Sequence, residues 1–402
     1  MKKIVSLFII LCMLICLVPA AFAADNVQDK TLSFNSDGKF KIVVINDFQD
    51  TQDTSEKSLK MLRKVLDTEK PDLVVLNGDQ LCDSFPKRSF RNFRTAIGNL
   101  VSEIDARKIP FIYTYGNHDN DKTATASLAR QATIYHAYDY CFAAVDGYDS
   151  GTYNKLVMSS DGTYPALNIY MMNTGDWDYQ GSKGGVTDEQ VEWYKSKSDG
   201  LRAANGGNAV PSMLFQHIPV KETWKLLREV PEGTDGAVKC HFEGLEKWYV
   251  LDESKVFPSA YNSFRESICS EHPSRSTGQY EAWCEKGDII GAFFAHDHMN
   301  NFLGKTDEGI VMGYNRGFGY GSYGDGDKRG CGVLVFDEND IENYEFYNVT
   351  YEELFAGEPY VPDEPDTPED EGGFLGFVSH IRSAIADFFY SIFDRITGLF
   401  GC

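Results

Sequence analysis

The chain has 402 residues, of which 42% are hydrophobic and 24% charged, a composition typical of a globular protein with room for one large domain or two small ones. Its formal net charge is −22. Because such an acidic surface repels polyanions, we expect no nucleic-acid binding. A small phosphate ester stays a suitable ligand wherever bound cations reverse the local charge.

The first residues predict a signal peptide, residues 1–23. Lys2 and Lys3 precede an apolar run, which ends in a small-x-small pattern at Ala21 and Ala23. The run is short for a membrane span. We expect cleavage after Ala23 and a secreted or extracytoplasmic protein, with an uncleaved anchor as the alternative.

An α/β pattern follows a polar lead-in at residues 24–37. Apolar runs predict strands at residues 40–45, 73–76, 109–113, 166–172, 212–215, 289–295, 333–336 and 344–349. Helical periodicity over about 59–66 and 88–107 separates the first three runs. Thr187, with Gln190 three residues later, predicts another helix start. Alternating strands and helices are typical of a layered α/β domain.

The later chain divides by composition. The predicted domain spans residues 38–350 and contains a long mixed insert at 221–287. Residues 351–372 include a run rich in proline and acid that is typical of a linker. The tail, 373–402, carries an apolar stripe over 374–400 and predicts an amphipathic helix. Docking or self-association and attachment to a membrane surface are both open, since the polar face is not rich in lysine or arginine.

Seven cysteines remain after signal cleavage, and no Cys-x-x-Cys pair occurs. This pattern argues against a zinc site built from thiolates. Export permits disulfides, and Cys269 with Cys284 in the insert is the first pair we expect.

Polar side chains follow five of the predicted strands. They are Asp47 with Gln49, Asp79, Asn117 with His118, His217, and His296 with His298. Each alone has a structural explanation, such as a helix cap, a turn or a core histidine. As a set, oxygen and imidazole donors at successive strand ends are what a two-metal hydrolytic site requires.

The charges of this set are consistent with two cations. Divalent ions about 3.5–4 Å apart repel each other, so a bridging anion is needed, and Asp79 can bridge. A bridging water becomes hydroxide near neutral pH and can attack phosphorus in line. A histidine outside the metal shell can protonate the leaving alkoxide.

The ordered motifs resemble those of the calcineurin-like metallophosphoesterases, and in particular the purple acid phosphatase-like branch. The strings that carry the resemblance are Phe40-Lys41-Ile42-Val43, Gly116-Asn117-His118-Asp119, His217-Ile218-Pro219 with Glu222, His296-Asp297-His298 with Asn301-Phe302, and the Gly313-Tyr314-Asn315-Arg316 to Tyr323-Gly324 region. The resemblance covers roughly residues 38–350. It implies an α/β fold with four layers, α/β/β/α, around two central mixed sheets.

The resemblance also implies roles for individual residues. Asp47, Asp79 and His298 would hold one metal, and Asp79, Asn117, His217 and His296 would hold the other. His118 would act as the acid or charge stabiliser, with Asp119 hydrogen-bonded to it.

Three positions depart from the family pattern. Gln49 stands where many relatives have a metal-binding histidine, so the first metal position is the weaker one. Cys82 stands in place of the iron-binding tyrosine of true purple acid phosphatases, so we expect no purple colour. Ala295 replaces a glycine at a strand end, where alanine also fits.

The sequence therefore predicts a secreted binuclear phosphoesterase that uses two divalent or mixed-valence ions of manganese, iron or zinc. A phosphorylated molecule would be its substrate, with Arg316, Tyr320 and Tyr323 as candidate contacts. A surface arginine and packed tyrosines are the structural alternatives for these three. The alternative function is a non-catalytic or weakly catalytic metal-binding protein attached to a surface.

Overall fold

The computed structural model describes residues 30–82, 92–120, 127–175, 184–242, 245–269 and 277–358. The predicted signal peptide, most of the predicted linker and the predicted amphipathic tail lie outside these residues. Among the described residues, no helix has the length and apolar character needed to cross a membrane.

A five-stranded sheet has the order β15-β14-β2-β3-β4. Its strands are β2 (Lys39–Ile45), β3 (Leu73–Asn77), β4 (Phe111–Thr114), β14 (Gly330–Asp337) and β15 (Glu345–Thr350). β2, β3 and β4 run parallel, whereas β14 is antiparallel to both of its neighbours. Three helices belong to this half, α2 (Glu56–Glu69), α3 (Phe93–Asp105) and α4 (Leu128–Tyr135).

A seven-stranded sheet has the order β1-β5-β6-β7-β11-β13-β12. Its strands are β1 (Leu32–Ser33), β5 (Tyr153–Met158), β6 (Pro165–Met172), β7 (Ser212–Gln216), β11 (Ile289–Phe294), β12 (Phe302–Lys305) and β13 (Val311–Tyr314). Within this sheet, β6 pairs with β7, β7 with β11 and β11 with β13, and all three pairs are parallel. Helices α5 (Asp188–Ala204) and α6 (Gln279–Lys286) cover its outer face.

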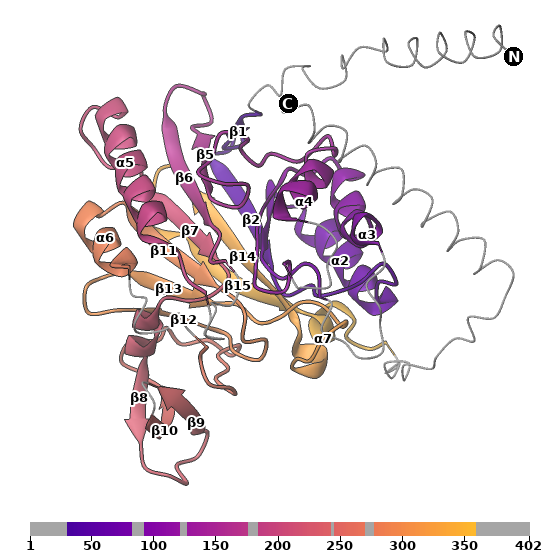
Figure 1. Cartoon of the computed structure of the whole chain (residues 1–402), viewed down its shortest axis with the longest axis vertical. Helices are drawn as coiled ribbons and strands as arrows, with labels where there is room; N and C mark the ends of the chain where they lie inside the picture. Colours follow the sequence, from indigo (N-terminus) through magenta and orange to yellow (C-terminus); the bar gives the residue numbers. More distant parts are fainter. Residues whose placement is uncertain are drawn as a thin grey trace, which may run out of the picture.

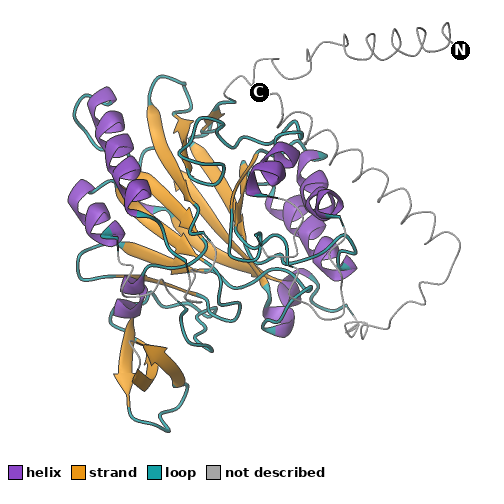
Figure 2. Cartoon of the chain, viewed as in Figure 1, coloured by secondary structure: helices purple, strands orange, loops and turns teal. Residues whose placement is uncertain are grey.

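The two sheets pack face to face between two helical layers (Figure 1), which confirms the four-layer sandwich. Figure 2 shows α2, α3 and α4 on one side of the sheets, with α5 and α6 on the other. The described part of the molecule has two hydrophobic cores, and strand β6 contributes side chains to each of them. Ile169 and Met171 face the core between the sheets, whereas Tyr170 and Met172 face the core beneath α5. Because successive side chains of a strand point to opposite faces, a strand buried on both faces is apolar throughout.

The insert at 221–287 forms a separate small sheet with the order β8-β10-β9. Its strands are β8 (Leu227–Val230), β9 (Val238–Phe242) and β10 (Leu245–Leu251), and they project from the body of the molecule (Figure 1). The described residues also form the short helices η1 (Lys221–Leu226), η3 (Gly326–Lys328), η4 (Ile341–Asn343) and α7 (Tyr351–Leu354).

Each predicted strand is present, with bounds shifted by two residues or fewer except at the start of β14. The predicted start of α5 is confirmed, because Thr187 and Gln190 form a reciprocal capping box. In the described residues the second predicted helix begins later than expected, at Phe93, where the Asn92 side chain accepts the Thr95 N–H.

The folded domain extends beyond residues 38–350 at both ends. β1 lies in the predicted lead-in and pairs with β5, because the apolar side chains of Leu32 and Phe34 are buried there. α7 lies in the predicted linker, and Tyr351 packs on the ring of Tyr320 with centroids 5.5 Å apart.

The expected disulfide between Cys269 and Cys284 is wrong. Both residues are thiols, as are the four other cysteines of the described chain. Cys284 lies on the exposed side of α6, whereas Cys269 lies beside His296. The different locations of the two thiols explain why they do not pair.

Candidate metal centre

The predicted metal ligands converge from the two sheets. The five-stranded sheet supplies residues that follow β2, β3 and β4, and the seven-stranded sheet supplies residues that follow β7 and β11. In chain order they are Asp47, Gln49, Asp79, Asn117, His217, His296 and His298. All seven are at most 8% exposed. The site therefore lies where the carboxyl ends of parallel strands from both sheets meet.

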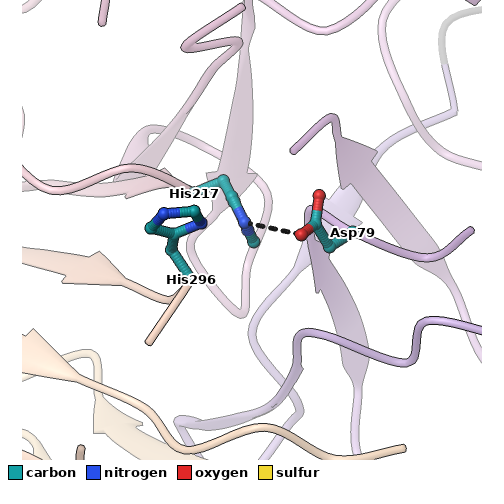
Figure 3. Close-up of side chains that lie close together, drawn as sticks. All are labelled: Asp79, His217 and His296. Carbon is teal, nitrogen blue, oxygen red and sulfur yellow. Dashed lines mark ion pairs between the residues drawn. The ribbon is translucent and has the colours of Figure 1, made fainter. Parts of the chain in front are cut away.

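Asp79, His217 and His296 form the centre of the site (Figure 3). Their ligand atoms lie within 4.8 Å of one another. His217 Nε2 is 3.1 Å from Asp79 Oδ2. The rings of His217 and His296 meet edge to face, with centroids 5.3 Å apart.

Asp47 and His298 form an adjoining pair. His298 Nε2 lies 3.3 Å from Asp47 Oδ1, and the same oxygen is 3.8 Å from His217 Nε2. The imidazole of His217 therefore faces both carboxylates, Asp47 and Asp79, and links the two halves of the site.

The tautomers of two histidines are set by backbone carbonyls. His217 Nδ1 is 3.1 Å from the Asn77 carbonyl oxygen, and His298 Nδ1 is 2.7 Å from that of Tyr323. Because a carbonyl only accepts, each Nδ1 must donate its proton there. The Nε2 lone pair of each neutral ring then faces a carboxylate, an arrangement that is stable only with a proton or a cation between them.

Several buried ligand atoms lack well-directed hydrogen bonds. Within the described chain these include Asp47 Oδ1, Asn117 Oδ1 and His217 Nε2. Buried polar atoms are normally paired, and oxygen with imidazole nitrogen is a donor set that divalent metals accept. The residues present therefore fit a metal centre.

The backbone of the site is held in an uncommon conformation. Six non-glycine residues of the described chain have a positive φ, and four belong to the site: Asp47 (50°), Gln49 (41°), Asp79 (52°) and His296 (86°). Such residues cost energy and persist where surrounding structure fixes them. Backbone bonds do this here, since Asp47 N donates to Gly78 O and Gln49 N donates to Asp79 O.

Gly116 allows the loop after β4 to approach Asp79. A Cβ atom at Gly116 would lie 2.1 Å from Asp79 Oδ1, a distance that no side chain tolerates. The glycine of the Gly-Asn-His-Asp motif therefore lets the Asn117 and His118 loop close onto the central carboxylate.

The family model for calcineurin-like phosphoesterases matches residues 40–300. The chain belongs to this family. Two Arabidopsis thaliana proteins are similar over most of their length: probable inactive purple acid phosphatase 29 is 24% identical over 81% of this chain and 83% of that protein, and probable inactive purple acid phosphatase 14 is 25% identical over 77% and 78%. Among solved structures, a dimetal phosphatase from Danio rerio covers 78% of this chain and 99% of its own, with 13% identity and a TM-score of 0.46.

Charge coupling between the ionisable groups of this site is strong. Burial opposes a charge on Asp79, but the imidazoles of His217 and His118 outweigh it and lower the pKa of Asp79. Burial likewise lowers the pKa of His217, yet Asp79 and Asp47 raise it to about 9. Without a metal, a proton on His217 thus stands in the place that a cation would take.

Gln49 presents its amide nitrogen to the site. Gln49 Nε2 donates to Asp79 Oδ2 over 2.8 Å. An amide nitrogen has no lone pair for a metal, so ligation by Gln49 requires its amide to rotate. The prediction that Gln49 is a ligand stays a prediction, and its observed contact is a hydrogen bond to the central carboxylate.

Asp119 binds the backbone of the site, and its expected hydrogen bond to His118 stays a prediction. Its carboxylate accepts backbone N–H bonds from Gly116, Asp79 and Leu81, at 2.8, 2.8 and 3.0 Å. Burial and the charge of Asp79 raise the pKa of Asp119 to about 7. Asp119 thus ties the loops after β3 and β4 together. His118 is half-buried beside them, and its backbone N–H donates to Asp79 Oδ1 over 2.8 Å.

The guanidinium of Arg316 is bound to backbone carbonyls rather than free to contact a phosphate. It is 4% exposed and donates to the carbonyls of Lys328 and Tyr261. Its backbone contacts the site, since Asn46 Nδ2 donates to Arg316 O over 2.9 Å. A phosphate contact would require these side-chain bonds to break, so the structure favours a clamp that holds the loop after β13.

The two candidate tyrosines have different surroundings. The ring of Tyr323 stacks on His298, with centroids 4.1 Å apart and planes 11° apart, and the residue is 52% exposed. Tyr320 donates to Asp327 over 3.0 Å and packs on Lys57 and Arg329. Tyr323 therefore borders the site, whereas Tyr320 takes part in packing.

Sequence reasoning missed the residues that support the ligands. Asn46 donates to Asp47 Oδ2 over 2.9 Å, and Glu266 accepts from the hydroxyl of Tyr323 over 3.1 Å. Asn46 directly precedes a ligand, which is a signal that could have been used. Glu266 lies in the insert, where sequence spacing carries no such signal.

Proposed function

We propose that this family member is a secreted, binuclear metal-dependent phosphoesterase that hydrolyses phosphate monoesters or diesters. The observation that carries the proposal is the buried cluster of Asp79, His217 and His296, whose donor atoms lie within 4.8 Å of one another. A buried carboxylate facing two imidazoles is costly without a cation, and it is the donor set that a hydrolytic metal needs.

The residues would divide between two metal positions. Asp79, Asn117, His217 and His296 would hold one cation, and Asp47, Asp79 and His298 would hold the other. When bound, a pair of divalent ions supplies Lewis acidity and an acidified water for in-line attack on phosphorus. Manganese, iron and zinc all suit mixed oxygen and nitrogen donors.

His118 has the proton-transfer role in this proposal. It is half-buried, and its imidazole is close enough to Asp79 to lower the pKa of that carboxyl. Its backbone N–H donates to Asp79 Oδ1 over 2.8 Å. An imidazole in this position can give a proton to the leaving alkoxide or stabilise the charge that develops. Asp119 supports it by holding the backbone of the loop.

A second candidate function is a metal-binding protein with little or no turnover. Two observations favour it. The amide nitrogen of Gln49 faces Asp79, which weakens the position formed by Asp47 and His298. The two plant relatives have names that call them probably inactive. One tightly bound metal or none, with no hydrolysis, would favour this candidate.

The test combines metal analysis with hydrolysis of p-nitrophenyl phosphate and bis-p-nitrophenyl phosphate. Loss of an outer-shell partner already costs about 10–100-fold in activity or metal affinity, so Asp79→Asn should cost more than about 100-fold. The matched control is Asp307→Asn, whose side chain is 79% exposed. Activity that survives Asp79→Asn would overturn the proposal.

A further inference from the structure

A second cluster of donors lies against the first. The ligand atoms of Cys269, His296 and Asp297 lie within 4.8 Å of one another. Cys269 lies in the insert, and the other two residues follow β11. The histidine is common to this cluster and to the one formed with Asp79 and His217.

Hydrogen bonds fix the geometry of this second cluster. The backbone N–H of Cys269 donates to Asp297 Oδ2 over 2.9 Å. The hydroxyl of Tyr314 donates to the same oxygen, and Asp297 N donates back to Tyr314 Oη over 3.1 Å. The carboxylate is thus held rigidly beside the thiol by a buried tyrosine.

The exposure of the three residues permits a cation to enter. His296 and Asp297 are 8% and 4% exposed, whereas Cys269 is half-buried and lies toward solvent. A tetrahedral cation with bonds of about 2.0–2.3 Å needs donor atoms roughly 3.3–3.8 Å apart. Because Asp297 is held in place, small rotations of the Cys269 and His296 side chains would bring atoms that lie within 4.8 Å to that separation.

The donor types differ from those of the proposed catalytic centre. That centre offers oxygen and nitrogen, but the second cluster adds sulfur. Thiolate favours borderline and soft cations, and one sulfur, one imidazole and one carboxylate suit zinc. The absence of a Cys-x-x-Cys pair argued against a thiolate zinc site, yet the fold brings a single thiol to a histidine and an aspartate.

We propose that Cys269, His296 and Asp297 bind a further divalent cation of the zinc type, and that this cation competes with the catalytic metals for His296. The thiol releases its proton to solvent as the sulfur–metal bond forms. A cation bound by this cluster rotates the His296 side chain away from Asp79 and His217 and so slows hydrolysis. The inhibitory part rests on the proposed function, whereas binding at the cluster does not.

The binding test uses Co²⁺ as a spectroscopic probe on the full-length protein. Wild type should show a thiolate-to-cobalt charge-transfer band in the near ultraviolet, and Cys269→Ser should lose it. Cys284→Ser is the matched control, because that thiol is exposed on α6 and belongs to neither cluster. A band that is absent from wild type, that persists in Cys269→Ser or that disappears in Cys284→Ser overturns the proposal.

A second variant separates this proposal from the proposed function. Asp79→Asn should abolish hydrolysis and keep the cobalt–thiolate band, because Asp79 is not part of the second cluster. If wild type shows the band but no hydrolysis, the catalytic proposal fails and the binding site stands.

Inhibition is measured with excess Zn²⁺ on the metal-loaded enzyme. The Zn²⁺ concentration that halves activity should rise at least about tenfold in Cys269→Ser, because loss of even an outer-shell partner costs about 10–100-fold in metal affinity. Equal inhibition of wild type and Cys269→Ser would show that the cluster does not compete for His296.

Discussion

The five-stranded sheet ends in oxygen donors at the site, whereas the seven-stranded sheet ends in nitrogen donors. Asp47, Asp79 and Asn117 follow strands of the first sheet, and the histidines of the site's centre follow β7 and β11 of the second. The two sheets also differ in backbone conformation. Three of the four ligands with a positive φ come from the five-stranded sheet.

This difference shows what each sheet lacks. Buried carboxylates need positive charge, and the five-stranded sheet brings only the imidazole of His118, so its neighbour must supply further protonated imidazoles or a shared cation. A cation that takes ligands from both sheets joins them. Metal affinity should therefore be coupled to the stability of the whole sandwich.

Loss of a nitrogen donor should be as damaging as loss of an oxygen donor. We expect His217→Gln to reduce phosphoesterase activity more than about 100-fold, because His217 faces both carboxylates. The control is His136→Gln, a histidine that caps α4 and contacts Cys141. Steady-state kinetics and metal content check this. A His217→Gln enzyme with normal activity would mean that the seven-stranded sheet is not needed for the chemistry.

The metal-free protein should lose stability as the pH rises. The pKa of His217 is raised from its ordinary value of 6.5 to about 9. A raised pKa gives stability that is complete below the unfolded value and is lost as the pH rises through the folded one. The shift corresponds to a loss on the order of 3 kcal/mol in the free energy of unfolding. Most of this loss falls at a pH above the pKa of Asp119, which is about 7.

Thermal unfolding in a chelator, between about pH 7.5 and about pH 10, measures this loss. His217→Gln provides the control, because its melting temperature should vary less with pH. Added metal should remove the fall in stability, since a cation then takes the place of the proton. A melting temperature that rises with pH in the chelator would contradict the assigned charge pairing.

Gln49→His should strengthen the weaker metal position. The backbone of Gln49 has a φ of 41°, a region in which histidine is tolerated better than most residues. An imidazole offers a lone pair where the amide nitrogen offers none, so we expect about tenfold tighter binding of the second cation. Calorimetric metal titration checks this, with Gln52→His as a control outside the site. Unchanged affinity would show that residue 49 does not reach the cation.

The smallest effect should come from the rim of the site. Tyr323→Ala removes a ring stacked on His298 and should cost about 0.5–1.5 kcal/mol of metal or transition-state binding. Tyr323→Phe keeps the stack and should change activity less. Tyr320→Ala should leave kcat/KM per folded enzyme unchanged, because Tyr320 contacts Lys57 and Arg329 rather than the ligands. A larger loss in Tyr320→Ala than in Tyr323→Ala would reverse this assignment.

Local sequence pattern was enough to predict where the strands lie along the chain and which polar residues follow them. Short apolar runs such as residues 73–76 predict buried strands, and the polar residues that follow them then lie at the carboxyl ends of these strands. The ligand types are therefore readable from local pattern. The direction of a side chain does not follow from local pattern. The Arg316 guanidinium donates to backbone carbonyls, and the Asp119 carboxylate accepts from backbone N–H groups.

Which donors lie close together depends on contacts between segments that are remote in sequence. Cys269 lies far from Asp297 in sequence, and no spacing rule connects the insert to β11. A hydrogen bond from the Cys269 backbone to the Asp297 carboxylate makes that connection. The amide nitrogen of Gln49 likewise faces Asp79 because the loop after β2 pairs with the loop after β3. Contacts between segments remote in sequence set side-chain direction, since direction depends on which hydrogen-bond partner the fold brings near.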